Sequence, residues 1–226
     1  MTEFATPSDL SGAFIVVEGI DGSGSTTHSR LLSKALEKQG HEVLLTCEPT
    51  HGPIGGLIRQ VLQKRLFVPD DAGPRAFSWS TMALLFAADR LDHLDSSVVP
   101  ALRESRIVVS DRYDLSSLAY QSATAGDADR ALGWIGELNR LALRPDVTVV
   151  LDVDPDVAAE RRGARGTREE LFEVDAIQTR LAAIYTRAEE LVPGDRVAHV
   201  RAEGPVEETA ARVLEAVRSA LPRLFS

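Results

Sequence analysis

Hydrophobic and polar positions divide the chain into two kinds of segment. Short and nearly continuous apolar runs occur at residues 13–18, 42–46, 106–110, 147–153 and 196–201. Such runs are typical of parallel strands that are covered on both faces. Longer stretches with helical spacing of apolar residues lie at 25–39, 53–65, 75–104, 127–143, 155–163, 171–190 and 205–222. The alternation predicts an α/β fold, a doubly wound five-stranded parallel sheet flanked by helices, with ligands at the carboxyl ends of the strands.

Length and composition narrow the class of protein. A chain of 226 residues that is 44% hydrophobic can bury one full core, so we expect a single domain over residues 13–226. Residues 1–12 are polar and turn-rich, and we expect them to form a flexible arm. The net charge of −9 argues against a broad surface for nucleic acid or for a membrane. Cys47 is the single cysteine, which excludes an internal disulfide and favours a cytoplasmic location.

A glycine-rich loop follows the first predicted strand. The sequence EGIDGSGSTT at residues 18–27 matches the phosphate-binding pattern G-x-x-x-x-G-K-[ST], except that Ser25 stands at the lysine position. Backbone N–H groups in such a loop, together with the start of the next helix, favour phosphate oxygens. The alternative is a tight turn from strand to helix that Ser25 or Thr26 caps. The residues expected to bind phosphate are Gly19, Ile20, Asp21, Gly22, Ser23, Gly24, Ser25, Thr26 and Thr27.

Acidic and basic side chains accompany this loop at the same edge of the predicted sheet. Asp21 lies within the loop, where a carboxylate needs Mg²⁺ or a sugar hydroxyl between itself and a phosphate, although it also suits a plain turn. Asp111 and Arg112 follow the strand at 106–110. An acid and an arginine at this edge can hold Mg²⁺ and clamp a phosphate, whereas the alternative is a surface ion pair.

Two further patterns suggest ligand contacts. Phe86 and Arg90 lie one helical turn apart, so a flat ring and a planar donor group share a face that suits a nucleobase; the alternative for Phe86 is ordinary core packing. The segment ERRGARGTREE at 160–170 carries Arg161, Arg162, Arg165 and Arg168 among glycines. In an acidic chain this cluster indicates an anionic partner, and the alternative is a solvated basic helix end.

Five motifs together resemble one family. EGIDGSG, EPT…PIGGLIR, LLFAADR, DRYDLSSLAYQ and RPDVTVVLDVDPDVAAER follow one another in order, and the resemblance runs from residue 13 to about residue 220. They resemble the thymidylate kinase family of P-loop nucleoside monophosphate kinases, and the third and fourth motifs are specific to it among P-loop kinases. The resemblance implies phosphorylation of dTMP to dTDP by Mg-ATP in dTTP synthesis. It also implies a P-loop kinase fold with an arginine-rich lid at about 160–171, and a homodimer.

The same resemblance assigns roles to single residues. Phe86 would stack on thymine, Arg90 would bond to its O4 atom, and Tyr120 would pack under the sugar and disfavour a 2′-hydroxyl. Thr26 and Asp111 would belong to the Mg²⁺ site. The residues expected to bind dTMP are Glu48, Arg59, Phe86, Arg90, Arg112, Ser117, Tyr120 and Gln121. The candidate catalytic residues are Asp21, Asp111, Arg112, Arg165 and Arg168.

Two positions depart from the family pattern. Cys47 stands where many bacterial members have an arginine that binds phosphate, and Ser25 replaces the loop lysine. We expect Arg165 and Arg168 to supply the missing charge from the lid, since an arginine can favour the transferring phosphoryl group. Two alternatives stay open, namely a catalytically silent nucleotide-binding homologue and a kinase of another 5-substituted deoxyuridylate.

Overall fold

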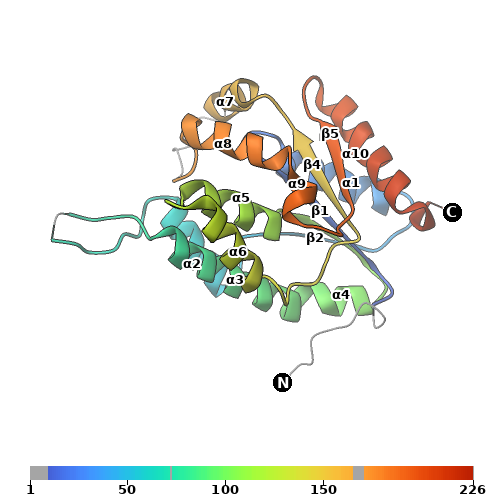
Figure 1. Ribbon diagram of the computed structural model, residues 1–226. Helices are drawn as coiled ribbons and strands as arrows, with labels where there is room; N and C mark the ends of the chain where they lie inside the picture. The colour runs from blue at the N-terminus through green and yellow to red at the C-terminus, as the bar shows by residue number, and fades with distance from the viewer. Residues whose placement is uncertain (1–9, 72, 165–170, 226) are drawn as a thin grey trace.

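A parallel five-stranded sheet forms the centre of the computed structural model, which describes residues 10–71, 73–164 and 171–225 (Figure 1). The strands lie in the order β2-β3-β1-β4-β5. They are β1 (Ala13–Gly19), β2 (Val43–Cys47), β3 (Ile107–Asp111), β4 (Val147–Asp152) and β5 (Val197–Arg201). The order runs outward from β1 in both directions, which confirms the predicted doubly wound sheet.

Helices cover both faces of this sheet (Figure 1). On one face α1 (Ser25–Glu37) and α10 (Val206–Ala220) pack against the strands and against each other. The other face carries further helices, among which α4 (Val99–Arg103) packs on β3, α5 (Asp114–Thr124) on β1 and α8 (Asp175–Tyr185) on β4. The further helices are α2 (Pro53–Leu62), α3 (Trp79–His93), a π-helical segment (Leu94–Val98), α4 (Val99–Arg103), α5 (Asp114–Thr124), α6 (Ala128–Leu138), α7 (Pro155–Ala164), α8 (Asp175–Tyr185) and α9 (Ala188–Leu191).

Strand β1 shows why its sequence is continuously apolar. Ile15 and Val17 belong to the core cluster shared with α1 and α10, whereas Phe14 and Val16 belong to a cluster on the opposite face. All seven residues of the strand are buried. Because successive side chains point to opposite faces and both faces are covered, neither set of positions can be polar without a partner.

Helix boundaries differ from the sequence pattern in three places. The segment expected as one helix at 75–104 begins at Trp79, where Ser78 caps the first turn by accepting from the Thr81 amide, and it passes through the π-helical segment into α4. The segment expected at 171–190 divides into α8 and α9. Helix α5 was not predicted, because its sequence DLSSLAYQSAT is rich in residues of low helix propensity.

The part of the expected arm that the structure describes contacts the domain. The amides of Ser11 and Gly12 donate to the carbonyl of Leu102, while residues 1–9 lie outside the described residues. Among the helices of the described chain, none combines the length and apolarity needed to cross a membrane.

A buried carboxylate from β1 holds the start of α5. Glu18 is fully buried, and its Oε1 atom accepts hydrogen bonds from the amides of Tyr113 (2.8 Å) and Ser116 (3.1 Å). Its Oε2 atom accepts from the hydroxyls of Ser116 (2.6 Å) and Tyr185 (2.9 Å). A carboxylate at the start of a helix satisfies amides that have no partner within the helix. Glu18 therefore supplies from another strand the stabilisation that the local sequence of α5 lacks.

Burial raises the pKa of Glu18 from 4.5 to about 7, although the charge of Arg112 and the hydrogen bonds oppose this shift. The folded state then binds the proton more tightly than the unfolded state. The resulting stabilisation is complete below pH 4.5 and is lost as the pH rises through about 7.

We predict that Glu18→Gln, which cannot titrate, removes this pH dependence. Between pH 5 and pH 8 the free energy of unfolding of the wild type should fall relative to that of the variant, by on the order of 3 kcal/mol at most. Urea unfolding of both proteins across this pH range measures the difference. Two curves that run parallel would contradict the assignment.

Candidate active site

The loop between β1 and α1 leaves its backbone open to an anion. Gly24, which precedes α1, has a left-handed conformation with φ of 92°, and no side chain in the described chain caps the amides of the first turn. Gly22 also has a positive φ of 93°, and a Cβ atom there would lie 2.3 Å from the carbonyl oxygen of Ala158. The close approach of α7 therefore requires glycine at this position. Uncapped amides at the start of a 13-residue helix suit phosphate oxygens.

Ser25 begins α1 and is almost fully buried, so the position of the missing lysine holds a small neutral side chain. A cation reaches the loop from another element. Arg162 on α7 donates to the carbonyl of Asp21 at 2.8 Å and pairs with Asp175 at 2.7 Å. Arg161 on the same helix donates to the carbonyl of Ala202 at 2.9 Å.

The four arginines of the expected lid thus separate into two groups. Arg161 and Arg162 belong to α7, where both have protein partners. Arg165 and Arg168 lie outside the described residues.

Arg112 connects the end of β3 with the glycine loop. Its backbone adopts a left-handed conformation with φ of 73°, which is uncommon for a residue with a side chain. The guanidinium donates to the carbonyl of Gly19 at 2.8 Å, to the hydroxyl of Ser116 at 3.2 Å and to the carboxylate of Asp21 at 2.7 Å. It also lies over the ring of Tyr120, 5.1 Å from the centroid. The strained backbone is held by contacts to three segments of the site.

Thr26 and Asp111 meet where the first turn of α1 faces the end of β3. The Thr26 hydroxyl donates to Oδ2 of Asp111 at 2.5 Å. The other carboxylate oxygen, Oδ1, is buried and has no hydrogen-bond partner among the described residues. A hydroxyl beside a carboxylate with an unused oxygen fits the ligand preference of Mg²⁺, which usually takes one or two carboxylates and completes its shell with water and phosphate. Within the described residues no cluster of three or more acidic, histidine or cysteine side chains forms a cage for a metal.

A cavity of about 510 Å³ opens beside these residues. Asp21, Thr26 and Asp111 line its wall near the loop, and α3 and α5 contribute much of the remainder. Phe86 lines it while only partly buried, and its side chain also packs against the core cluster of Ile58, Val61 and Met82. All the residues expected to bind dTMP are in the lining, namely Glu48, Arg59, Phe86, Arg90, Arg112, Ser117, Tyr120 and Gln121.

Several polar side chains that line this cavity have unused hydrogen-bonding capacity, Gln121 and Ser29 among them. Gln121 is 1% exposed, and its Oε1 atom has no hydrogen-bond partner in the part of the chain that is described. The hydroxyl of Ser29, on α1, is likewise buried and unpaired within the described ranges. A buried amide oxygen that lacks a partner is costly, so it indicates a group that a ligand completes.

Arg90 is part of a buried network as well as of the cavity wall. Its guanidinium pairs with Glu48 at 2.7 Å and donates to Ser117 at 3.1 Å and to Asn139. Glu48 also contacts Nδ1 of His93 at 3.1 Å. Because Glu48 and Arg90 are both almost fully buried, each compensates the charge of the other.

Sequence reasoning missed one residue that contacts the loop. Gln178 on α8 is fully buried; its Nε2 atom donates to Oδ2 of Asp21 and to the carbonyl of Phe172, both at 2.8 Å. Its Oε1 atom accepts from the amide of Asp21 at 3.0 Å. No local pattern signals this role, because Gln178 reads as one polar residue within an amphipathic helix.

His28 and His93 are both buried. Cys47 is partly exposed and lines the cavity.

Comparisons with known proteins agree with this geometry. The family model described as thymidylate kinase matches residues 17–213. A probable thymidylate kinase of Pyrococcus horikoshii is 37% identical over 94% of this chain and 98% of its own length. A thymidylate kinase of Geotalea uraniireducens is 34% identical over 93% of this chain and 98% of its own. One of Pelobacter propionicus is 39% identical over 74% of this chain and 75% of its own. The chain belongs to the thymidylate kinase family.

Proposed function

We propose that this chain transfers the γ-phosphoryl group of ATP to dTMP, giving dTDP and ADP for dTTP synthesis. The observation that carries the proposal is the cavity beside the glycine loop, which Phe86 lines and in which the buried amide oxygen of Gln121 has no hydrogen-bond partner among the described residues. The amide oxygen can accept from the N3–H group of thymine, whereas the corresponding ring nitrogens of adenine and cytosine carry no hydrogen. Phe86 then provides the stacking surface.

The remaining acceptor contacts follow from the cavity lining. Arg90 and Ser117 face the same space as Gln121, where they suit the carbonyl oxygens of the base. Tyr120 lies under the sugar and disfavours a 2′-hydroxyl. Arg59 and Arg112 grip the acceptor phosphate, while Asp21 and Glu48 lie near the sugar and that phosphate.

Phosphoryl transfer of this kind needs positioning and charge neutralisation more than a strong base. Amides of residues 19–27 hold the phosphates of ATP. Thr26 and Asp111 hold Mg²⁺, which, when bound, neutralises charge on the ATP phosphates. Arg112 stands at the boundary between donor and acceptor, because it contacts the Gly19 carbonyl and Asp21 in the loop while lining the cavity.

The charge that a loop lysine would supply is provided in our proposal by Arg165 or Arg168. An arginine that engages only when the lid closes favours the transition state over bound ATP. Ser25 also supports the alternative of a silent nucleotide-binding homologue. Asp111 and Arg112 argue against a silent homologue, because both contact residues of the glycine loop and the start of α1.

The proposal also includes a quaternary structure and a location in the cell. We infer a homodimer, supported by exposed apolar side chains on α2, α3 and α6, namely Leu57, Leu84 and Trp134. Sedimentation velocity distinguishes a dimer from a monomer of 24.5 kDa. A cytoplasmic location fits the single cysteine, and fractionation of the source cells tests it.

The first test is acceptor choice. We expect ATP to phosphorylate dTMP better than dUMP, and both far better than UMP, CMP or AMP, because Gln121 and Tyr120 select base and sugar. A coupled assay with this panel of nucleoside monophosphates measures kcat/KM for each. Preference for a purine or a ribonucleotide would refute the assignment. A 5-substituted deoxyuridylate that is phosphorylated with a higher kcat/KM than dTMP would identify the chain as a kinase of that nucleotide.

The second test concerns the contact between α8 and the loop. Gln178→Leu keeps the approximate volume but removes the hydrogen bonds to Asp21, so the Asp21 carboxylate should lose its orientation. We expect kcat/KM for dTMP to fall about 10- to 100-fold, as displaced site residues typically cause. Thr179→Val on the exposed face of the same helix is the matched control. Equal activity of the two variants would show that Gln178 only fills space.

The third test concerns the missing lysine. Arg165→Ala or Arg168→Ala should lower kcat by about 10²-fold or more if one of these side chains stabilises the transferring phosphoryl group. Ser25→Lys should raise kcat little, because Arg165 or Arg168 would already supply the positive charge. If the wild type is inert with dTMP and Ser25→Lys activates it, the silent-homologue alternative is correct.

A further inference from the structure

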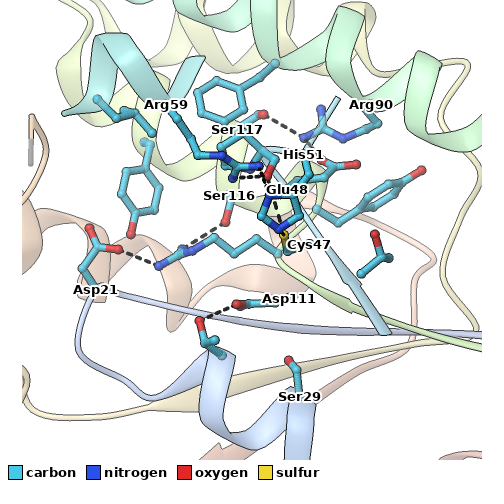
Figure 2. Close-up of a pocket in the computed structure, with 18 of the residues that line it drawn as sticks. Asp21, Ser29, Cys47, Glu48, His51, Arg59, Arg90, Asp111, Ser116 and Ser117 are labelled. Atoms are coloured by element: carbon cyan, nitrogen blue, oxygen red, sulfur yellow. Dashed lines mark hydrogen bonds and ion pairs between the residues drawn. The ribbon is translucent and has the colours of Figure 1, made fainter. Parts of the chain in front are cut away.

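His51 occupies a position in the cavity wall that the proposed contacts leave without a role (Figure 2). It lies in the connection between β2 and α2 and is exposed. Its Nδ1 atom is 3.0 Å from Nη2 of Arg59, and its Nε2 atom is 3.9 Å from Sγ of Cys47. The imidazole therefore bridges a cation and the thiol that ends β2.

Arg59 fixes which nitrogen of this ring carries a proton. A guanidinium has only donors, so Nδ1 of His51 must accept the hydrogen bond and cannot be protonated in this geometry. The neutral ring then carries its proton on Nε2. As a result His51 presents an N–H donor, and the ring orientation is set by Arg59.

Among the described residues, the acceptor recorded for this donor is a weak one. A thiol sulfur is a poor acceptor, and the separation of 3.9 Å lies near the limit for a hydrogen bond to sulfur. An anionic oxygen in the cavity would be a far better partner. The position also suits one, since Cys47 lies opposite Asp111 in the register of β2 and β3, beside the proposed metal site.

Arg59 itself has limited capacity left for a ligand. Its Nη1 atom donates to the carbonyl of Pro49 at 2.7 Å, and its Nη2 atom donates to the carbonyl of Thr50 as well as to His51. Much of its hydrogen-bonding capacity is thus used to shape the connection that carries His51. Position 47, at the end of β2, carries a thiol, which is a weak donor. This wall of the cavity is consequently short of donors unless His51 contributes.

We propose that the Nε2–H group of His51 donates a hydrogen bond to the phosphate of the acceptor nucleotide, in an orientation that Arg59 imposes. The inference rests on the proposed function, since it assumes that a nucleoside monophosphate occupies the cavity. It assigns to His51 a phosphate contact for which the neighbouring Cys47 thiol is only a weak donor. It also gives Arg59 a second task, that of fixing a tautomer.

The test compares variants that mimic one ring nitrogen at a time. Gln places its amide nitrogen near the position of Nε2, whereas Asn places its amide near Nδ1 and cannot reach the phosphate. Leu removes both. Isothermal titration with dTMP and with thymidine, which lacks the phosphate, separates a phosphate contact from a general effect on the pocket.

We expect His51→Leu and His51→Asn to weaken dTMP binding about tenfold or more, as loss of a hydrogen bond to a charged group predicts. His51→Gln should stay within about threefold of the wild type. Thymidine affinity should be the same in all four proteins, which also shows that the pocket is intact. Unchanged dTMP affinity in His51→Leu, equal losses for dTMP and thymidine, or equal behaviour of the Gln and Asn variants would each overturn the proposal.

Binding and phosphoryl transfer are measured separately, so a wrong role for His51 differs from a wrong kinase assignment. A wild type that binds dTMP but transfers no phosphoryl group would refute the kinase activity and leave the His51 comparison valid. A wild type that transfers phosphoryl to dTMP, with variants that bind as it does, would refute only the role of His51. A wild type that does not bind dTMP would refute both.

Discussion

The hydrogen bonds of the Arg112 guanidinium hold the two halves of the site together. One side chain from the end of β3 contacts the Gly19 carbonyl, the Asp21 carboxylate and the Ser116 hydroxyl. This is possible because β3 lies beside β1 in a parallel sheet, so both strands deliver their carboxyl ends to one edge. A planar group with several fixed donors can make these contacts at once, which an ammonium group cannot. The glycine loop and the cavity therefore form one site.

Asp21 extends this connection to the elements on either side of residues 165–170. Arg162 on α7 contacts its carbonyl, and Gln178 on α8 contacts its amide and its carboxylate. A change in the position of α7 or α8 would therefore reach Arg112 through Asp21. The arrangement links the region that carries the candidate lid arginines to the residue that borders both substrates, and the link consists of hydrogen bonds between buried or half-buried groups.

Much of this could be predicted from the sequence where the signal was local. The five strands were located to within a residue or so, because an apolar run covered on both faces is a direct consequence of burial. The contacts of Glu18 and Gln178 could not be predicted, since Glu18 meets Tyr113 across 95 positions and Gln178 meets Asp21 across 157. Helix α5 was missed for the same reason. Its stabilising partner is a carboxylate on β1, whereas its own residues favour turns and caps.

If Arg112 and Asp21 act as one unit, a double-mutant cycle will reveal their coupling. Arg112→Lys keeps the positive charge but removes the planar set of guanidinium donors, and Asp21→Asn keeps the shape of the side chain but removes its negative charge. Steady-state kcat/KM for dTMP in the two single variants and the double variant gives the interaction free energy. The structure predicts strong coupling, with the double variant losing little more than Arg112→Lys alone. Losses that simply multiply would show that the two residues act independently and that Arg112 does not work through Asp21.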